Sequence, residues 1–331
     1  MRILIDTGHP AYIHFFAPIA KELEKRNHTV VFSIREKDCS LPIINAHNFS
    51  YKSKGKGSYS VLLKPFHFFS AIFSIFSITR KIKPDLFLSF SSPYAGIVSA
   101  IFRKKHIVLD DTEIDVLARK IYYTFSDILV TPKSFKLDIG RKQIRVNAFK
   151  EQAYLKDYTF SPETGNYILV RLVNHGAMHD LFSKVWHKQE SFKFIRELAQ
   201  KHSVVISSEI PLPGDLKPHE YSQPPEDLHN VISKAKLVVG ESATVSTEAA
   251  VLGVPAVYID YNTRGYTENL EHEYGLVRHF LPVNHELEKA KGFIHDIMEN
   301  PVNPYYQEQR KKLFRETDDI VEYMLNLIEV G

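Results

Sequence analysis

Residues 240–260, GESATVSTEAAVLGVPAVYID, combine residue types and spacings that suit a phosphorylated ligand. Residues 236–239 predict a strand that ends at Gly240, and the pattern after it predicts a helix. Free N–H groups and the helix dipole favour an anion at the start of such a helix. The small residues Ser242, Ala243 and Thr244 would let a phosphate come close, and two of them offer hydroxyl groups. This stretch therefore indicates a seat for a diphosphate.

Glu248 lies four residues after Thr244, so both side chains share one face of the predicted helix. A carboxylate at this position could accept hydrogen bonds from both hydroxyls of a ribose. The alternative is that the serine and threonine only cap the helix and that Glu248 is solvated in its first turns. The pattern alone leaves both interpretations open.

Acidic residues gather in LDDTEID, where Asp110, Asp111, Glu113 and Asp115 follow a predicted strand. Four carboxylates suggest a divalent metal by their number of oxygens. Asp111 and Thr112 also suit the N-terminus of a helix, where acids are favoured.

A planar guanidinium stands at the end of another predicted strand, in VRLVNHGAMHD. Arg171 would bind a diphosphate through its two parallel N–H groups. His175, His179 and Asp180 follow in the loop, and His179 is a further candidate for substrate binding. The two histidines have i,i+4 spacing, but no third ligand is near in sequence, so zinc is not expected.

Strands separated by helical patterns predict βαβ units and two parallel sheets. The first domain is expected at 1–150 and the second at 151–331, with the polar segment 146–165 as a linker. One last helix, about 303–329, is expected either to stay with the second domain or to pack back on the first. Two such domains are expected to face a central cleft, with ligands beyond the carboxyl ends of the strands.

Length and composition set the class of protein. A chain of 331 residues with 44% apolar and 24% charged residues is globular and long enough for two domains. The formal charge of +3 does not favour nucleic acid, and one cysteine, Cys39, excludes an internal disulfide. Asp6 interrupts any signal-peptide core, and no apolar run is long enough to span a bilayer. A cytoplasmic protein is expected.

The run PFHFFSAIFSIFSITRKIK, within residues 64–83, predicts a helix that is apolar nearly all round. Phe66, Phe69, Phe73 and Phe76 share one face, and a second apolar face suits burial against the sheet. The flanking basic residues fit a helix that lies on a membrane surface. A dimer interface would equally suit the exposed face.

The pattern of a small polar turn, Glu248, a pair of alanines and Gly253-x-Pro255 resembles the donor-binding signature of GT-B fold glycosyltransferases. It is similar in particular to the enzyme that adds N-acetylglucosamine to the peptidoglycan lipid intermediate. It also resembles the non-hydrolysing UDP-N-acetylglucosamine 2-epimerases, which share the fold. The resemblance implies that Ser242, Ala243 and Thr244 hold the diphosphate of a nucleotide sugar and that Glu248 binds its ribose.

A resemblance over most of the chain is to the domain-of-unknown-function family 354, which is itself GT-B-like. ILIDTGHPAYIHFFAPIAKELEKRNH, LDDTEI, SDILVTP, VRLVNHGAMHD and ESATVSTEAAVLGVPA carry it. The stretch DDTEI departs from that family, because Ile114 stands where a histidine often follows the glutamate. No role for an imidazole at that position is expected.

The same resemblance places the loop with His9 and the helix turn with His14 against the sugars, so His14 is a candidate general base and His9 a substrate ligand. Local capping by His9 and packing by His14 are the alternatives. GT-B enzymes generally need no catalytic metal, which favours Asp111 or Glu113 as a base or substrate ligand. Related enzymes hold the donor sugar after the last apolar run, where Glu268 and Asn269 are the candidates in YNTRGYTENLEHEYG.

These residues and the resemblance predict an enzyme that moves a sugar from a nucleotide-diphosphate donor to a glycan or lipid-linked acceptor in surface polysaccharide or glycolipid synthesis. No cofactor is expected, since the nucleotide sugar is the substrate. Two alternatives stay open. One is a nucleotide-sugar 2-epimerase, and the other is a GT-B protein that binds nucleotide sugars with an inactive site.

Overall fold

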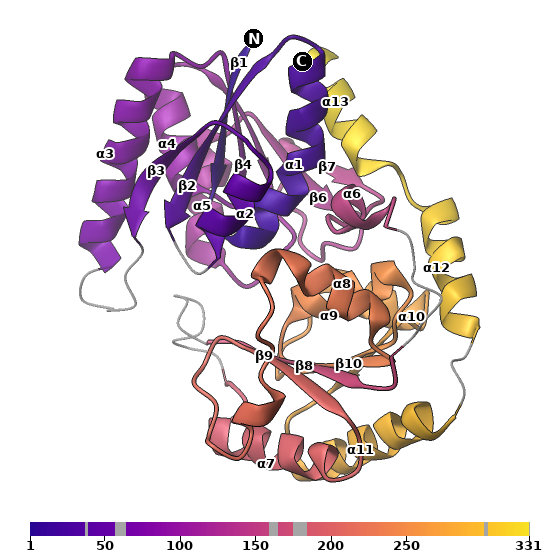
Figure 1. Cartoon of the computed structure of the whole chain (residues 1–331). Coiled ribbons are helices and arrows are strands. Elements are labelled where there is room, and N and C mark those ends of the chain that lie inside the picture. The colour runs from indigo at the N-terminus through magenta and orange to yellow at the C-terminus, as the bar shows by residue number, and fades with distance from the viewer. Residues whose placement is uncertain (37–38, 57–63, 159–164, 175–183, 301–303, 331) are drawn as a thin grey trace. The chain divides into compact units, whose positions relative to one another are not determined.

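The computed structural model describes residues 1–36, 39–56, 64–158, 165–174, 184–300 and 304–330. The chain divides into two compact units. Unit 1 comprises Met1–Tyr154 and Asp318–Gly331, and unit 2 comprises Leu155–Thr317. Figure 1 shows a β-sheet with helices around it in each unit.

The sheet of unit 1 has seven strands, all parallel, in the order β3-β2-β1-β4-β5-β6-β7. The strands are β1 (Arg2–Thr7), β2 (Thr29–Glu36), β3 (Tyr51–Lys56), β4 (Leu86–Phe90), β5 (Lys105–Leu109), β6 (Ile128–Pro132) and β7 (Gln143–Val146). The helices are α1 (Pro10–Lys25), α2 (Ser40–Ala46), α3 (Lys64–Ile82), α4 (Pro93–Ile101), α5 (Val116–Phe125), α6 (Gln152–Leu155, whose last residue belongs to unit 2) and α13 (Ile320–Val330).

The apolar residues of β1 alternate between the two faces of this sheet, as a strand buried on both sides requires. Ile3 and Ile5 belong to a core formed with side chains of α1, α2 and α13. Leu4 belongs to a second core on the opposite face, with Ile75 of α3 and Val98 of α4. Helices therefore cover both faces of the sheet.

The sheet of unit 2 has five strands, all parallel, in the order β12-β11-β10-β8-β9. The strands are β8 (Ile168–Leu172), β9 (Val204–Ser208), β10 (Leu237–Gly240), β11 (Ala256–Ile259) and β12 (Val277–Phe280). The helices are α7 (Lys188–Ala199), α8 (Leu228–Lys234), α9 (Ala243–Leu252), α10 (Gly265–His272), α11 (Asn284–Glu299) and α12 (Tyr305–Glu316), with 3-10 turns at Lys217–His219 and Pro225–Asp227. Figure 1 shows α7 and α11 on one side of this sheet and α8, α9 and α10 on the other.

Both strand orders reverse direction along the sheet, between β1 and β4 in unit 1 and between β8 and β10 in unit 2. Ligands of open α/β sheets bind beyond the carboxyl ends of the strands at such a point. The predicted fold class, two α/β domains with parallel sheets, is confirmed.

Two expectations about organisation need correction. The segment expected as one last helix forms α12 and α13, which are separated by residues 317–319, and α13 packs in the core of unit 1. Residues 146–155 are not a solvated linker, because Val146, Ala148 and Ala153 are buried in the same core. In the described part of the chain, no helix is both long and apolar enough to cross a membrane.

Candidate functional site

The reversal point of unit 2 joins the ends of β8 and β10 closely. Gly240 lies opposite Arg171 in the register, and a Cβ added to Gly240 would lie 2.2 Å from the carbonyl oxygen of Arg171. The next residue, Glu241, is buried, and its N–H donates to that same oxygen at 3.1 Å. The Glu241 carboxylate accepts from the N–H of Val173 at 3.2 Å. Only glycine permits this approach, which fixes the position of the helix that follows.

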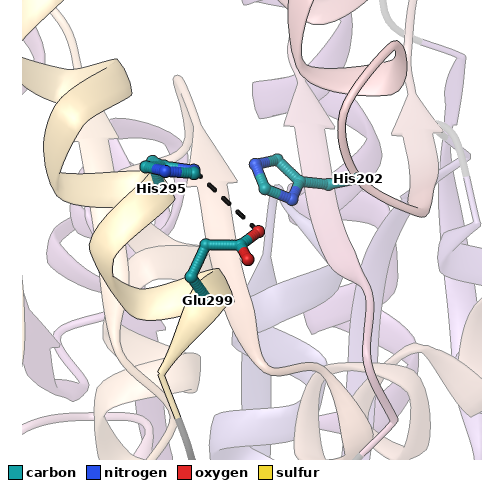
Figure 2. A group of neighbouring side chains, drawn as sticks. All are labelled: His202, His295 and Glu299. Atoms are coloured by element: carbon teal, nitrogen blue, oxygen red, sulfur yellow. Dashed lines mark ion pairs between the residues drawn. The ribbon is translucent and has the colours of Figure 1, made fainter.

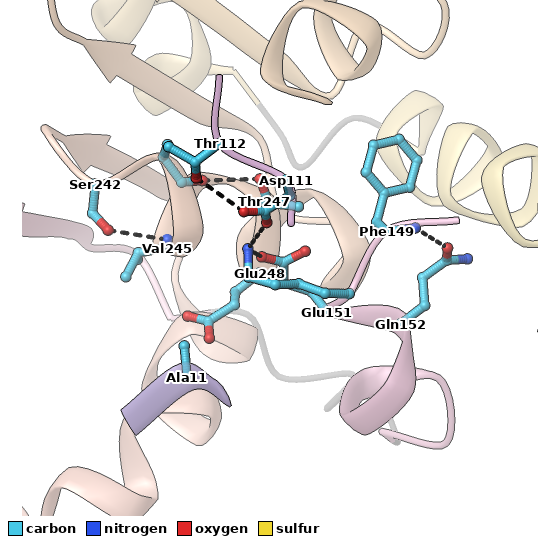
Figure 3. A network of polar contacts seen from close by, with 12 residues as sticks. Ala11, Asp111, Thr112, Phe149, Glu151, Gln152, Ser242, Val245, Thr247 and Glu248 are labelled. Atoms are coloured by element: carbon cyan, nitrogen blue, oxygen red, sulfur yellow. Dashed lines mark hydrogen bonds and ion pairs between the residues drawn. The ribbon is translucent and has the colours of Figure 1, made fainter. Parts of the chain in front are cut away.

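Helix α9 begins at this point with Ser242 as its N-cap. The Ser242 hydroxyl oxygen accepts from the N–H of Val245 at 3.2 Å (Figure 3). Ala243 and Thr244 form the first turn and are half-buried. The first N–H groups of a helix have no acceptor within it and carry its positive dipole end. The carboxyl edge of the sheet therefore presents N–H donors to an anion. The Ser242 hydroxyl oxygen already accepts the hydrogen bond that caps the helix.

Glu248 lies one turn further along α9 and is 4% exposed. Its Oε1 lies 3.1 Å from Nε2 of His229, which is on α8. The solvated glutamate of the capping interpretation is therefore not what the structure shows. His229 was not among the predicted site residues, since it lies 19 positions before Glu248 and no local sequence pattern pairs the two.

Arg171 is held at the carboxyl edge by two residues of the β9 side. Its Nη1 donates to Ser207 Oγ at 2.8 Å, and its Nη2 forms an ion pair with Glu209. Glu209 also accepts from the N–H of Asn174 at 3.0 Å. A diphosphate would have to compete with Glu209 for this guanidinium.

The loop after β11 lies on the same edge, because β11 neighbours β10. Here the Thr267 hydroxyl oxygen accepts from the N–H of Arg264, the N-cap of α10, at 3.1 Å. Thr263 donates its hydroxyl to the half-buried Glu268, and Asn269 is half-buried beside it in sequence. His179, the remaining predicted ligand of unit 2, lies outside the described residues.

At the reversal point of unit 1, a buried carboxylate lies one residue before the end of β1. Asp6 is fully buried, with Lys54 Nζ at 2.5 Å and Ser92 Oγ at 2.5 Å. Burial lowers the pKa of the Lys54 ammonium, while the neighbouring Asp6 carboxylate opposes that shift. Ser92 is also the N-cap of α4, since its oxygen accepts from the N–H of Ala95 at 3.1 Å. The sequence offered no sign of this ion pair.

Asp110 follows β5 and is buried among three hydrogen-bond donors. Its Oδ1 accepts from Ser91 Oγ at 2.9 Å and from the N–H of Thr112 at 3.1 Å, and its Oδ2 accepts from the Tyr122 hydroxyl. Burial raises the pKa of this carboxyl to about 7, against the opposite effect of the hydrogen bonds from Tyr122 and Thr112. Burial also raises the pKa of Tyr122. Asp110 therefore titrates near neutral pH.

Asp111 turns to a different partner, Lys150, whose Nζ lies 2.7 Å from Asp111 Oδ2 and 2.5 Å from Oε1 of Glu151. The Thr112 hydroxyl donates to Asp111 Oδ1 at 3.0 Å (Figure 3). Glu113 accepts from the N–H of Lys136 at 3.2 Å. These acidic residues therefore have separate partners, in contrast to the shared metal site that their number suggested.

The helix-start interpretation of Asp111 and Thr112 is wrong. Helix α5 begins at Val116, and its N-cap is Asp115, which accepts from the N–H of Ala118 at 3.2 Å. Asp111 and Thr112 lie in the loop before that cap.

The two predicted histidines of unit 1 lie at the start of α1. His9 is the N-cap, and its Nδ1 accepts from the N–H of Ala11 at 3.2 Å, as the local alternative expects. His14 is half-buried, with its Nδ1 3.5 Å from Nε2 of His47 and its ring 5.5 Å from the ring of Tyr154. His14 therefore belongs to a cluster of aromatic rings, and His47 and Tyr154 were not predicted as its neighbours.

A separate group of possible metal ligands, His202, His295 and Glu299, lies at the amino edge of the unit 2 sheet (Figure 2). One donor atom of each lies within 4.8 Å of the others. The cluster adjoins a pocket of about 540 Å³ that Lys201 and Lys236 also line. Two ammonium groups oppose the binding of a cation, and we assign no metal to this cluster.

The fold is similar to those of several solved enzymes. The UDP-GlcNAc 2-epimerase of Methanocaldococcus jannaschii, in complex with UDP-GlcNAc and UDP, matches with a TM-score of 0.69 and 16% identity over 100% of both chains. The UDP-GlcNAc 2-epimerase of Neisseria meningitidis, bound to UDP-GlcNAc, matches with 0.67 and 15% over 95% of this chain and 99% of that one. The spinosyn forosaminyltransferase SpnP matches with 0.66 and 13% over 99% of each chain.

These likenesses show that the two units have the architecture of GT-B glycosyltransferases and UDP-GlcNAc 2-epimerases. No family model and no curated protein matches the chain. Membership in family 354 therefore stays a prediction.

Proposed function

We propose that the protein is a nucleotide-sugar enzyme that binds a nucleoside diphosphate sugar at the carboxyl edge of the unit 2 sheet. We further propose that it transfers the sugar to a glycan or lipid-linked acceptor. Proteins of the same fold that are named as UDP-GlcNAc 2-epimerases and sugar transferases support the substrate class.

The observation that carries the proposal is the start of α9. The helix begins at the reversal point of the sheet, where anionic ligands of α/β folds bind. Gly240 brings the helix start within one hydrogen bond of β8, and Glu248 stands on the same helix with a histidine at its carboxylate. A diphosphate would take the N–H groups near Ser242, Ala243 and Thr244, and the ribose hydroxyls would donate to Glu248.

His229 gives Glu248 a defined orientation in this proposal. Its Nε2 lies 3.1 Å from Oε1 of the Glu248 carboxylate, which limits how that side chain can turn. We therefore assign His229 as a positioning residue. His229→Ala should weaken UDP binding less than the loss of Glu248 does, since the carboxylate itself stays.

The test is calorimetry with UDP and with inorganic pyrophosphate on the wild type, on Glu248→Gln and on Glu308→Gln. Glu308 is an exposed residue of α12 paired with Lys311 and serves as the matched control. Glu248→Gln replaces hydrogen bonds to a charged group, worth about 1.5–3 kcal/mol, by bonds to a neutral amide oxygen, worth about 0.5–1.5 kcal/mol. UDP binding should therefore weaken by roughly 5- to 10-fold. Pyrophosphate, which has no ribose, should lose little affinity, and Glu308→Gln should change neither.

Equal losses for UDP and pyrophosphate would show that Glu248 organises the loop and does not touch the ribose. Unchanged affinity for both ligands would contradict the proposal that the nucleotide binds at α9. A panel of nucleoside diphosphates in the same assay identifies the base.

We also propose that the diphosphate binds without a metal, because the helix N-terminus supplies positive potential directly. UDP at about 100 times its dissociation constant should then stabilise the protein by about 2.7 kcal/mol in the presence of chelator. Loss of that stabilisation on adding chelator, for every common nucleoside diphosphate, would contradict the metal-free seat.

Transfer needs a base for the acceptor hydroxyl, and we propose His14, Asp111 or Glu113 of unit 1 for this role. His9, Arg171, Glu268 and Asn269 remain proposed substrate ligands. Replacing the true base should lower kcat and leave KM for the donor nearly unchanged.

A second candidate function is epimerisation, favoured by the several structural neighbours named as UDP-GlcNAc 2-epimerases. Incubation with UDP-GlcNAc and no acceptor separates the two. Epimerisation would give the 2-epimer under these conditions, whereas a transferase would leave the sugar nucleotide unchanged.

A further inference from the structure

Helix α3 exposes three phenylalanines on one face. Phe66, Phe69 and Phe73 are 70%, 68% and 71% exposed, and their i, i+3, i+7 spacing puts them in one stripe along the helix. Arg80 is also exposed and lies two helical turns beyond Phe73 on the same face. Single exposed apolar residues are ordinary, but a contiguous row of large ones marks an interaction surface.

The opposite face of α3 already has its partners. Ala71, Ile75 and Ile78 are buried, and the two isoleucines pack with Phe87 and Val98 in the second core of unit 1. The exposed phenylalanines are therefore not needed to hold the helix on the sheet. Figure 1 shows α3 at the outer edge of unit 1, beside α4 and β3.

The charge around this row is one-sided. Residues 49–84 contain seven Lys and Arg and neither Asp nor Glu. The rest of the chain then has 35 Lys and Arg against 39 Asp and Glu, so this segment alone makes the protein basic. One of the seven, Lys54, is buried against Asp6, whereas Lys52, Arg80, Lys81 and Lys83 are exposed.

We propose that α3 docks unit 1 on the surface of an anionic lipid bilayer, with Phe66, Phe69 and Phe73 inserted at the headgroup boundary. An amphipathic helix with aromatic residues on its apolar face and basic residues around it binds such surfaces by apolar burial together with attraction to anionic lipid. The proposal concerns a surface outside the nucleotide site, and it stands whether or not that site binds a nucleotide.

The charge decides between a bilayer and a second copy of the chain. A symmetric dimer through α3 would place the same basic segment of both copies face to face. Like charges so close oppose association, and no carboxylate within residues 49–84 is available to compensate them. An anionic bilayer would bury the phenylalanine side chains and attract the basic groups.

The experiment is co-sedimentation of the full chain with vesicles of phosphatidylcholine alone and of phosphatidylcholine mixed with phosphatidylglycerol. The wild type should bind the anionic vesicles strongly and the neutral ones weakly, and added salt should reduce the binding. Phe66→Ser/Phe69→Ser/Phe73→Ser should reduce the partition coefficient more than 100-fold. Arg80→Gln/Lys81→Gln/Lys83→Gln should reduce it roughly 100-fold on anionic vesicles, at about tenfold or somewhat less for each basic group.

Val116→Ser/Leu117→Ser is the matched control, because these residues of α5 are 49% and 58% exposed and lie elsewhere in unit 1. It should leave binding unchanged. All replaced side chains are exposed, and circular dichroism verifies that each variant is folded. The proposal is overturned if the wild type stays with the supernatant, if anionic lipid has no effect, or if the control loses as much binding as the phenylalanine variant. A dimer in sedimentation equilibrium that the phenylalanine variant abolishes would assign the surface to a second copy.

Discussion

Replacing Asp110 by asparagine should change how the stability of unit 1 depends on pH. Burial raises the pKa of Asp110 to about 7 in the folded chain, from 3.8 for the exposed group. The folded protein then binds more protons than the unfolded chain between pH 3.8 and about 7, so this carboxyl lowers the free energy of unfolding as pH rises. A shift of about three pKa units corresponds to about 4 kcal/mol, fully developed above pH 7.

His106, on the adjoining strand β5, has the opposite effect. It is fully buried between the hydroxyls of Ser89 and Ser126, and burial lowers its pKa to about 3. The unfolded chain binds the extra proton between about pH 3 and 6.5, so this imidazole raises the free energy of unfolding as pH rises. The two slopes nearly cancel in the wild type between about pH 4 and 6.5, at about 1.4 kcal/mol per pH unit each.

Asp110→Asn keeps the shape of the side chain and removes the contribution of Asp110 to the change of unfolding free energy with pH. The amide oxygen can still accept from Ser91 and Thr112, while the amide nitrogen can donate to the Tyr122 hydroxyl. The difference in unfolding free energy, variant minus wild type, should rise by about 1.4 kcal/mol per pH unit from about pH 4 to 7. Taking the difference cancels all other titrating groups.

Amide hydrogen exchange in β5, compared between the two proteins at each pH, measures this difference within unit 1. A constant difference from pH 4.5 to 7 would refute the reasoning, since Asp110 would then titrate alike in the folded and unfolded chain. His106→Gln is the reciprocal control. Without the opposing effect of His106, the free energy of unfolding of this variant should fall as pH rises, because Asp110 still titrates.

Three further predictions concern the elements that support the sites. Gly240→Ala places a Cβ 2.2 Å from the Arg171 carbonyl oxygen and should cost about 3 kcal/mol in a urea titration, whereas a loss under about 0.5 kcal/mol would mean that β8 and β10 separate freely. Lys54→Met leaves the buried Asp6 unpaired and should lower stability by about 3–5 kcal/mol, and adding Asp6→Asn should restore part of the melting temperature. Ser242→Ala removes the N-cap of α9 and should cost about 1 kcal/mol, with similar losses of affinity for UDP and pyrophosphate in calorimetry.

The central strands and the edge strand β9 (Val204–Ser208) could be predicted from sequence, and the other three edge strands could not. β4 is buried along its whole length, and its sequence, LFLSF, is apolar except for Ser89. β3 (YKSKGK), β7 (QIRV) and β12 (VRHF) each form one end of a sheet, and they were missed. An edge strand pairs on one side only and can present polar side chains to solvent, so its sequence need not contain such an apolar run.

In the candidate site, local patterns could be predicted from the sequence, whereas pairs of side chains that are distant in the chain could not. The turn at Ser242 and the acidic run after β5 could be located, because each is a local pattern beside a strand end. The pairs Asp111–Lys150 and Asp6–Lys54 could not, since 39 and 48 residues separate their members. The polar appearance of residues 146–155 misled for this reason, because one partner of the buried Lys150 is Asp111, which lies 39 positions away in the chain.

Helix α13 makes the order of synthesis matter for this fold. Ile320, Met324, Leu325 and Ile328 of α13 belong to the core of unit 1, whose other residues precede position 155. On the ribosome, the first 154 residues therefore emerge before α13 does. The apolar surface that α13 covers stays exposed until all of unit 2 has been made. Unit 2 is contiguous and can complete its own core earlier. We expect the nascent chain to present a temporary binding surface for chaperones on α1, and a stop codon after residue 317 to leave unit 1 permanently open there.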